Sequence, residues 1–130
     1  MNELAEIKKN EIAVAAENGQ IGELLKPLIN EIHLFDSYIA GTTHLSDKTV
    51  LDVIKVGDKL SLQREDNKFD SNAILILAAD GRKVGYVPEK DNIIFARLMD
   101  AGKMLSAQVR NIDIKGTFHI ISIGIYLVDF

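Results

Sequence analysis

A polar loop with a single aromatic residue, residues 66–72 (DNKFDSN), carries the side chains best suited to chemistry in this sequence. Phe69 offers a ring face for stacking, Asp70 offers two acceptor oxygens, and Asn67 offers an amide that both donates and accepts hydrogen bonds. Tyr86, which follows Gly85 in a neighbouring strand-like segment, adds a second ring with a polar tip. These residue types within one short stretch favour a small recognition surface.

Each of these residues also has a purely structural interpretation. Phe69 can plug one end of a barrel, and Asp70 and Asn72 are residue types that bond their own backbone in tight turns. Tyr86 can be a half-buried barrel residue with its hydroxyl at the rim. Arg64 is expected to be a structural partner of the carboxylates in the loop. Both interpretations remain open from the sequence.

Catalytic and metal-binding arrangements find no support in the sequence. Glu65, Asp66 and Asp70 lack the alternating oxygen ligands and the glycine of a calcium loop, and no second acidic cluster completes a two-metal site. The three histidines, at positions 33, 44 and 119, are far apart, and no Ser or Cys nucleophile motif accompanies them. We therefore expect a protein that is not an enzyme and needs neither metal nor cofactor.

Composition and charge narrow the class of ligand. The 130 residues suffice for one domain with its own core, and 47% of them are hydrophobic. The net charge of −4 argues against a protein that coats duplex DNA, because such binding rests on many phosphate contacts. Any nucleic-acid contact is therefore expected to be local, on a short or single-stranded target.

The expected location is the cytoplasm. The sequence contains no Cys, so no disulfide framework is available. Its first residues are charged throughout, unlike a signal peptide, and no apolar run approaches the ~20 residues of a membrane span. No membrane partner is expected.

The elements that must position these residues are expected to fall into two parts. Residues 1–35 are predicted to form an N-terminal helical extension, because Leu4, Ile7 and Ile12 recur at helical spacing. We expect this extension to be an appendage or dimerisation arm, which makes a homo-oligomer through the N-terminal helices one possible assembly. Residues 36–130 are predicted to form a β-barrel domain, since apolar residues there mostly alternate.

About six strands and one interior helix are predicted in this second part. Residues 73–79 form a continuous apolar run, typical of a strand buried on both faces, and Asp80-Gly81 predicts the hairpin that follows. The apolar parity changes between Val109 and Ile112, which predicts a bulge or a bend. The fold class is therefore mainly β with α (α+β), a small, strongly bent antiparallel barrel of the OB or SH3 kind.

The interior helix is predicted between Pro88 and Gly102, with Asp91 or Asn92 as its N-cap. One apolar stripe is expected to face the core, and its members are Ile94, Phe95, Leu98 and Met99. The last strand is predicted from apolar residues at period two, which are Ile121, Ile123, Ile125 and Leu127.

Several segments, spaced as they are here, resemble the HIRAN domain family over about residues 36–128. The most specific is the run REDNKFDSNAI from Arg64 to Ile74, followed by VGYVP at residues 84–88. Shorter matches are residues 39–42, 56–60 and 98–102. The resemblance implies an OB-like barrel that, in helicase-like DNA-remodelling proteins, binds the 3′ end of single-stranded DNA. It also implies bacterial relatives that occur alone or fused to nucleases and helicases.

The resemblance implies roles for individual residues. Phe69 matches the aromatic residue that stacks on the terminal base, Asp70 the carboxylate that accepts a hydrogen bond from the 3′-hydroxyl, and Asn67 the nearby amide. Tyr86 falls where the DNA-end binders have a polar ring that reaches a phosphate. Phe118 matches a second stacking aromatic residue.

The positions expected to hold phosphates depart from the family. Thr43 and His44 stand where the DNA-end binders carry Arg and Tyr. Glu89 stands where they carry a phosphate-binding Lys, which leaves Lys90 one position away. Fewer positive charges weaken the electrostatic part of binding, so stacking, worth about 1–3 kcal/mol per base, has to carry more of it.

The leading hypothesis is a non-catalytic module that recognises single-stranded DNA, at a 3′ end, in DNA repair or processing. Its predicted DNA-binding residues are Phe69, Asp70, Asn67, Tyr86, Thr43, His44, Lys90 and Phe118. The alternative is a protein-interaction or oligomerisation module, in which the N-terminal helices make the contact and the acidic surface excludes nucleic acid. A third hypothesis is an accessory subunit of a helicase or nuclease encoded elsewhere.

Overall fold

The structure, a computed structural model, describes residues 30–129. The first 29 residues of the helical extension predicted for residues 1–35, and the oligomer contact expected from it, lie outside the described residues. Its last six residues are described, and there the prediction is wrong: residues 30–35 belong to a strand, Asn30–Tyr38, of the sheet. Residues 32–128 form one compact unit. Within the described part of the chain, no helix is both long and apolar enough to cross a membrane.

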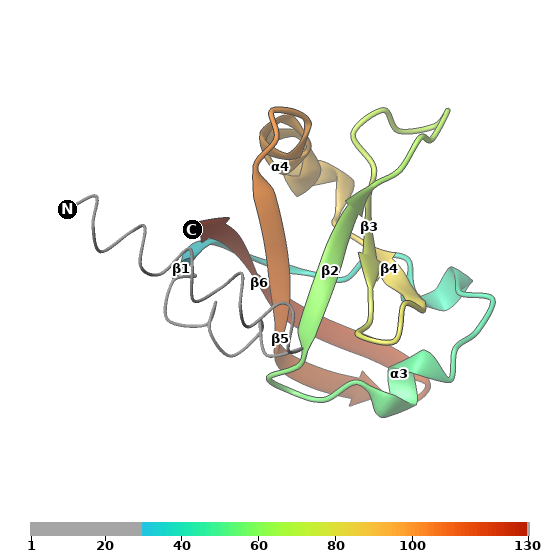
Figure 1. Cartoon of the computed structure of the whole chain (residues 1–130). Helices are drawn as coiled ribbons and strands as arrows, with labels where there is room; N and C mark the ends of the chain where they lie inside the picture. Colours follow the sequence, from blue (N-terminus) through green and yellow to red (C-terminus); the bar gives the residue numbers. More distant parts are fainter. Residues whose placement is uncertain (1–29, 130) are drawn as a thin grey trace, which may run out of the picture. The chain divides into compact units, whose positions relative to one another are not determined.

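A six-stranded antiparallel sheet is the main element of this unit, with the strand order β1-β6-β5-β2-β3-β4 (Figure 1). Its strands are β1 (Asn30–Tyr38), β2 (Lys59–Arg64), β3 (Ile74–Leu77), β4 (Lys83–Tyr86), β5 (Met104–Lys115) and β6 (Phe118–Asp129). The helices are the 3-10 helix η1 (Thr42–His44), the short α3 (Val50–Val53) and the longer α4 (Glu89–Asp100). The prediction of a mainly β barrel with one interior helix is confirmed.

The sheet curls until its two edges meet. Just after β1, Ala40 pairs with Tyr86 at the end of β4, with N–H···O distances of 2.8 and 2.9 Å in the two directions. Gly85 allows this approach, because a Cβ atom there would collide with the carbonyl oxygen of Ala40 and a methyl group of Ile39. The bridge between Ala40 and Tyr86 therefore closes the barrel, and it includes one of the predicted site residues, Tyr86.

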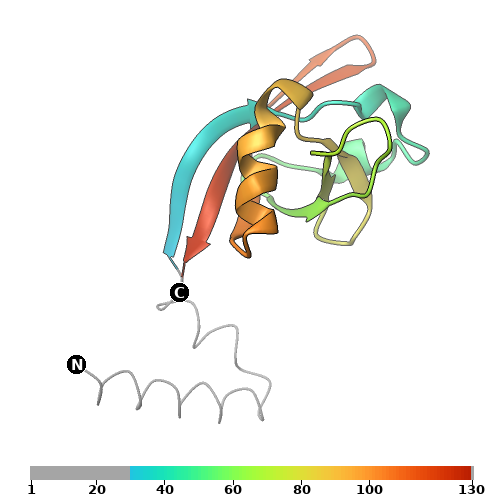
Figure 2. The same cartoon turned by 90° about the horizontal axis from the view of Figure 1, so that it is seen from above.

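The core lies inside the curl and consists mainly of aliphatic residues from alternating strand positions. In β6, Ile121, Ile123 and Ile125 are almost completely buried, as their period-two spacing predicts. Each fully buried Ile contributes about 1.5–3 kcal/mol to folding relative to an exposed one. From α4, Phe95 and Ala96 belong to this core. The ring centre of Phe95 lies 5.8 Å from that of Phe35 in β1, the strand that runs beside β6 (Figure 2).

The hairpin and bulge predictions are also confirmed. Gly81 has φ of 89° and its N–H bonds the carbonyl oxygen of Ala78 in the turn between β3 and β4. The pairing of β5 with β6 shifts register between Val109 and Asn111, which leaves Arg110 as the extra residue of a bulge. The prediction that residues 73–79 form a strand buried on both faces is wrong in one respect. In β3 only alternate residues are fully buried, so one face of the strand is partly exposed.

The predicted N-cap of α4 is wrong. The helix begins at Glu89 with Pro88 as its N-cap residue, and Asp91 and Asn92 lie inside the first turns. These two polar side chains bond other parts of the fold instead of the helix's own N–H groups. Ile94 of the predicted apolar stripe is also misplaced, since 66% of its surface is exposed.

Candidate functional site

The loop between β2 and β3 is shaped by its own side chains. The Oδ1 atom of Asn67 accepts a hydrogen bond from the N–H of Phe69 at 2.8 Å, and Oδ1 of Asp70 accepts one from the N–H of Asn72 at 2.9 Å. Asn and Asp favour such turns because their short side chains reach the backbone two residues onward. The structural interpretation of Asp70 as a turn residue therefore holds, and it leaves the second oxygen of Asp70 for other contacts. Asn72 enters this turn through its backbone N–H and not through its side chain.

Arg64, the last residue of β2, holds the end of this loop that leads into β3. Its guanidinium donates to the carbonyl oxygens of Ala73 (2.6 Å) and Ser71 (2.8 Å), and its Nε donates to the carboxylate of Asp100 at the end of α4 (2.9 Å). The side-chain hydrogen bond from Arg64 lowers the pKa of Asp100. The expectation that Arg64 pairs with the loop carboxylates is wrong. Its planar guanidinium donates hydrogen bonds to two backbone carbonyl oxygens of the loop and to the carboxylate of Asp100.

Asp70 is oriented by a buried partner on α4. The Oδ2 atom of Asp70 accepts a hydrogen bond of 2.8 Å from the side-chain amide of Asn92, which is only 2% exposed. The backbone N–H of Asn72 donates to one oxygen and the side-chain amide of Asn92 donates to the other, so the orientation of the carboxylate is fixed. Each oxygen retains a further lone pair. The Asp70 carboxylate is therefore held ready to accept hydrogen bonds from a ligand.

Tyr86 is half-buried and its hydroxyl already has partners. It donates to the carboxylate of Glu65 at 2.8–2.9 Å and accepts from the ammonium of Lys83 at 2.9 Å. The same ammonium lies 4.4 Å from the centre of the Tyr86 ring, and Glu65 also accepts from the amide of Asn67 at 3.1 Å. Glu65 thus ties the loop to β4 through two polar side chains.

Asn67, Asp70 and Tyr86 line one cavity of about 230 Å³, named here the Asp70 pocket. Its other lining residues are Ala40, Gly41, Ala73, Val87 and Glu89. Among these lining residues the charged side chains are two carboxylates, those of Asp70 and Glu89, and no Lys or Arg is present. Such a pocket suits a neutral or cationic hydrogen-bond donor better than a phosphate, which would meet two like charges.

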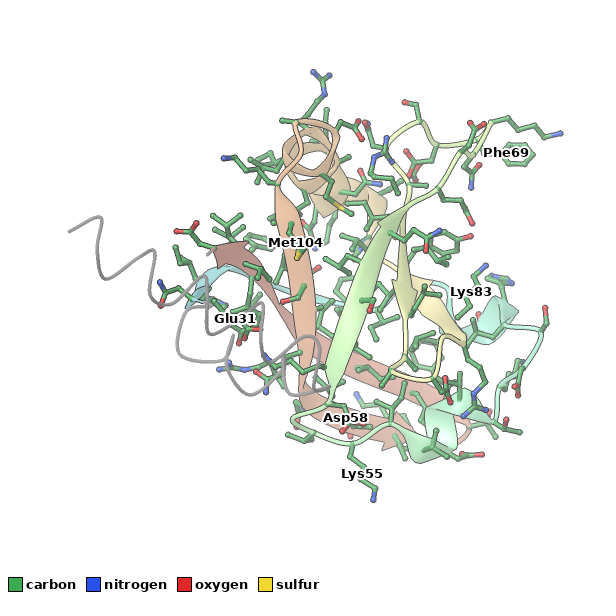
Figure 3. All side chains as sticks on the ribbon, viewed as in Figure 1. Glu31, Lys55, Asp58, Phe69, Lys83 and Met104 are labelled. Atoms are coloured by element: carbon green, nitrogen blue, oxygen red, sulfur yellow. The ribbon has the colours of Figure 1, made fainter. Side chains whose placement is uncertain are left out.

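Phe69 lies at the tip of the loop, outside the Asp70 pocket. Its side chain points away from the sheet (Figure 3) and 85% of its surface is exposed. The ammonium of Lys68 lies 5.2 Å from the ring centre. The alternative in which Phe69 plugs the barrel is wrong, because the ring is exposed to solvent at the loop tip.

The remaining predicted residues lie along two further cavities. Thr43, His44 and Phe118 line a cavity of about 480 Å³, the Phe118 pocket. Lys90 lines a cavity of about 500 Å³, the Arg110 pocket. The structure thus groups three of the eight predicted residues in the Asp70 pocket and three in the Phe118 pocket, while Lys90 and Phe69 stand apart.

Asn92 and Glu65 are important residues of the site whose contacts sequence reasoning missed. Asn92 was predicted as a helix cap. It precedes Phe95 by three positions and Ala96 by four, and residues at these spacings share one face of a helix, so Asn92 lies on the buried face of α4. A buried amide needs a hydrogen-bond partner, and that rule is the signal that points to Asp70. Glu65 gives no comparable signal, because its contact with Tyr86 joins distant parts of the chain.

Comparison with known proteins identifies the family. The sequence profile of the HIRAN domain matches residues 32–118, which is more than half of the chain. The chain belongs to the HIRAN domain family. No curated protein matches its sequence.

Two solved structures share the fold. A protein from Lactobacillus plantarum superposes with a TM-score of 0.73 at 26% identity, over 78% of this chain and 99% of that one. The HIRAN domain of human HLTF superposes with a TM-score of 0.62 at 18% identity, over 77% of this chain and 78% of that one. The barrel and its interior helix are thus the fold of this family.

Proposed function

We propose that this protein is a non-catalytic module that binds single-stranded DNA at its 3′ end, with the terminal hydroxyl in the Asp70 pocket. The observation that carries the proposal is the Asp70 carboxylate, oriented by Asn92 and Asn72 in a pocket whose charged lining residues are acidic. A terminal hydroxyl is a neutral donor and satisfies a free lone pair of Asp70. A terminal phosphate brings negative charge next to Asp70 and Glu89 and is rejected.

The other predicted residues have separate tasks in this proposal. Phe69, exposed at the loop tip, stacks on a base, which is worth about 1–3 kcal/mol. Asn67 sets the loop conformation through its bond to the N–H of Phe69. Tyr86 forms a wall of the pocket while its hydroxyl stays bonded to Glu65.

The phosphates of the strand are assigned to residues outside the Asp70 pocket. Thr43 and His44 are exposed at η1, and Phe118 offers a second ring in the same cavity. Lys90 supplies a positive charge on α4, one position after Glu89. The protein would act in DNA repair or processing, where a free 3′-hydroxyl marks an end that polymerases can extend, and would work beside a helicase or nuclease partner.

Fluorescence anisotropy tests this proposal. Short single-stranded oligonucleotides that end in a 3′-hydroxyl should bind more tightly than the same oligonucleotides ending in a 3′-phosphate. Asp70→Ala should remove that preference, whereas Asp70→Asn, which keeps the turn, should reduce it. Asp66→Ala is the matched control, because it removes an equal charge from an exposed position in the same loop. Equal binding of both ends by the unaltered protein would overturn the proposal.

A further inference from the structure

The three cavities form a continuous series along one segment of the chain. The Asp70 and Phe118 pockets share Ala40 and Gly41 as lining residues, and the Phe118 and Arg110 pockets share Tyr38 and Ile120. Tyr38 and Gly41 are at most about 10 Å apart along an extended chain. The three cavities are therefore neighbours, with the Phe118 pocket between the other two.

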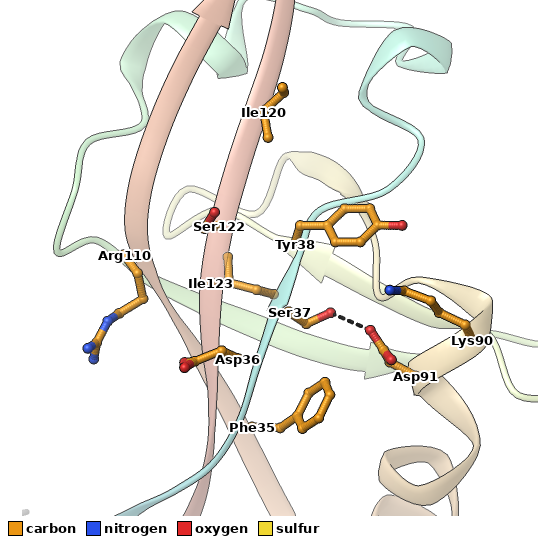
Figure 4. Close-up of a pocket in the computed structure, with 10 residues that line it drawn as sticks. All are labelled: Phe35, Asp36, Ser37, Tyr38, Lys90, Asp91, Arg110, Ile120, Ser122 and Ile123. Carbon is orange, nitrogen blue, oxygen red and sulfur yellow. Dashed lines mark hydrogen bonds between the residues drawn. The ribbon is translucent and has the colours of Figure 1, made fainter.

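The Arg110 pocket differs in chemistry from the Asp70 pocket. It contains two cationic side chains, Arg110 and Lys90, together with the exposed rings of Phe35 and Tyr38. Figure 4 shows Tyr38 and Lys90 on one side and Arg110 on the other, with Ser122 between them. Cations and exposed rings are the two components that proteins use to bind single-stranded nucleic acid.

Arg110 owes its position to the bulge in β5. It is the residue skipped where the pairing with β6 shifts between Val109 and Asn111, and bulges turn a side chain away from the direction the strand alternation would give it. The Arg110 side chain is exposed and donates to the hydroxyl of Tyr126 at 2.7 Å. A guanidinium has several N–H donors, so this bond leaves most of them for a phosphate.

Lys90 and Tyr38 form the opposite side of the pocket. The Lys90 ammonium lies 5.4 Å from the centre of the Tyr38 ring, and 42% of the Tyr38 surface is exposed. A base stacked on this ring would place its adjoining phosphate near the ammonium. Tyr38 is therefore suited to hold a base and Lys90 to hold the charge beside it.

The two carboxylates of the Arg110 pocket have partners within the fold. Asp91 accepts a hydrogen bond of 2.9 Å from the hydroxyl of Ser37, and Asp36 lies 2.7 Å from Nε2 of His33. The cations thus share the cavity with bonded carboxylates, whereas the Asp70 pocket has carboxylates and no cation among its lining residues. The charged lining residues are thus both acidic in the Asp70 pocket, whereas two cations balance two carboxylates in the Arg110 pocket.

We propose that the Arg110 pocket is a second DNA subsite, which holds nucleotides upstream of the terminal one by phosphate contacts to Arg110 and Lys90 and by stacking on Tyr38. This inference rests on the proposed function, because the terminal hydroxyl in the Asp70 pocket sets the register of the strand. It accounts for the missing cations near the 3′ end: the electrostatic part of binding is supplied further along the strand.

Binding as a function of oligonucleotide length tests the subsite. Affinity should rise from about two to about eight nucleotides, because a barrel of this kind covers about 4–16 nucleotides and the shortest oligonucleotide cannot reach the second subsite. Tyr38→Ala should weaken the longer oligonucleotide by about 5- to 150-fold, the value of one stacked base, and leave the shortest unchanged. Tyr38→Phe, which keeps the ring, should retain the affinity.

Salt dependence tests the phosphate contacts. Arg110→Gln and Lys90→Gln should each reduce the slope of log affinity against log salt concentration by about 0.7 for the longer oligonucleotide, since one phosphate contact is lost. Arg110→Lys, which keeps the charge, should retain the slope. Lys55→Gln is the control, because Lys55 is exposed and lines none of the three cavities.

The outcomes separate the two proposals. A preference for the 3′-hydroxyl with no dependence on length, or with unchanged slopes in Arg110→Gln and Lys90→Gln, overturns the subsite and leaves the end-binding function intact. Length-dependent binding that Tyr38→Ala and Arg110→Gln remove, without any preference between hydroxyl and phosphate ends, supports the subsite and overturns end recognition. Absence of binding to every oligonucleotide at low salt overturns both.

Discussion

The orientation of the Asp70 carboxylate depends on a residue that is almost completely buried. Asn92 is 2% exposed and donates to the Oδ2 atom of Asp70 from the buried face of α4. The direction of a single acceptor oxygen in the pocket is therefore set by the rotation of a helix about its axis. Substitutions on the buried face of α4 should therefore change the orientation of the Asp70 carboxylate, although these residues do not line the pocket.

Replacement of Asn92 by Ala should destabilise the fold and disturb the pocket together. The change removes a buried donor and leaves one oxygen of Asp70 with an unmet hydrogen bond, which costs about 1–3 kcal/mol. Urea denaturation should show this loss, and the preference for a 3′-hydroxyl should weaken at temperatures where the variant is folded. Asn111→Ala, at an exposed position of β5, should change neither quantity.

At the scale of single residues, the sequence predicts local chemistry and misses long-range partners. The turns of Asn67 and Asp70 follow from side-chain bonds that reach two residues along the chain, so residue type alone predicts them. The partners of Arg64 and Asn92 are separated from them by many residues. Such partners depend on how helix and strands pack, which residue type does not specify.

At the scale of elements, the approach of β4 to the end of β1 positions the Asp70 pocket. Ala40 and Tyr86 form the bridge and also line that pocket, with Gly41 beside them. The pocket wall therefore forms only if the two edges of the sheet meet. Gly85 is the residue that permits this contact.

Gly85→Ala should destabilise the protein by about 1–3 kcal/mol, the usual effect of forcing an atom into packed surroundings. The added methyl group has to displace the backbone of Ala40, so the affinity for 3′-hydroxyl ends should fall as well. Thermal unfolding and anisotropy measure the two effects. Gly57→Ala is a suitable control: it strains a turn with φ of 94° but meets no neighbouring atom, so it should lower stability and spare binding.

The elements that the sequence predicted share a strong local signal. Asp80-Gly81 marks a turn by the conformational freedom of Gly81, and the change of apolar parity marks the bulge at Arg110. The short helices η1 and α3 were missed, because three or four residues are too few to show a helical period. The cap of α4 was misjudged because its polar residues serve tertiary contacts.

At the scale of the whole molecule, the arrangement of cavities follows from the closed barrel and from no single motif. The segment from Tyr38 to His44 meets β4 on one side and β6 on the other, through Ala40 and through the bond from Ile39 to the carbonyl of Ile121. The sequence predicted a bent barrel correctly. It did not predict that Lys90 and Phe118 would line different cavities, because that separation depends on strand order.

Stability should fall in acid. Three carboxylates have a pKa below the ordinary value of 3.8, chiefly through hydrogen bonds that they accept: Asp47, Asp80 and Asp100. A lowered pKa in the folded state means that the stabilisation is complete above the unfolded value and is lost as the pH falls through the folded one.

The midpoint of urea denaturation should accordingly be steady above about pH 5 and decline below it. Asp100→Asn should flatten part of that decline, because it removes a group that binds a proton more readily in the unfolded state. A decline equally steep in Asp100→Asn would contradict the role assigned to Arg64.

The bridge between Ala40 and Tyr86 also has a kinetic consequence. It joins two edges of the sheet that are distant in sequence, so the chain must close a long loop before these hydrogen bonds form. Contacts of this kind form late in folding and are among the first to open when a native protein fluctuates. The amide protons of Ala40 and Tyr86 should therefore exchange with solvent faster than those of the buried isoleucines in β6, and a ligand in the Asp70 pocket should slow them.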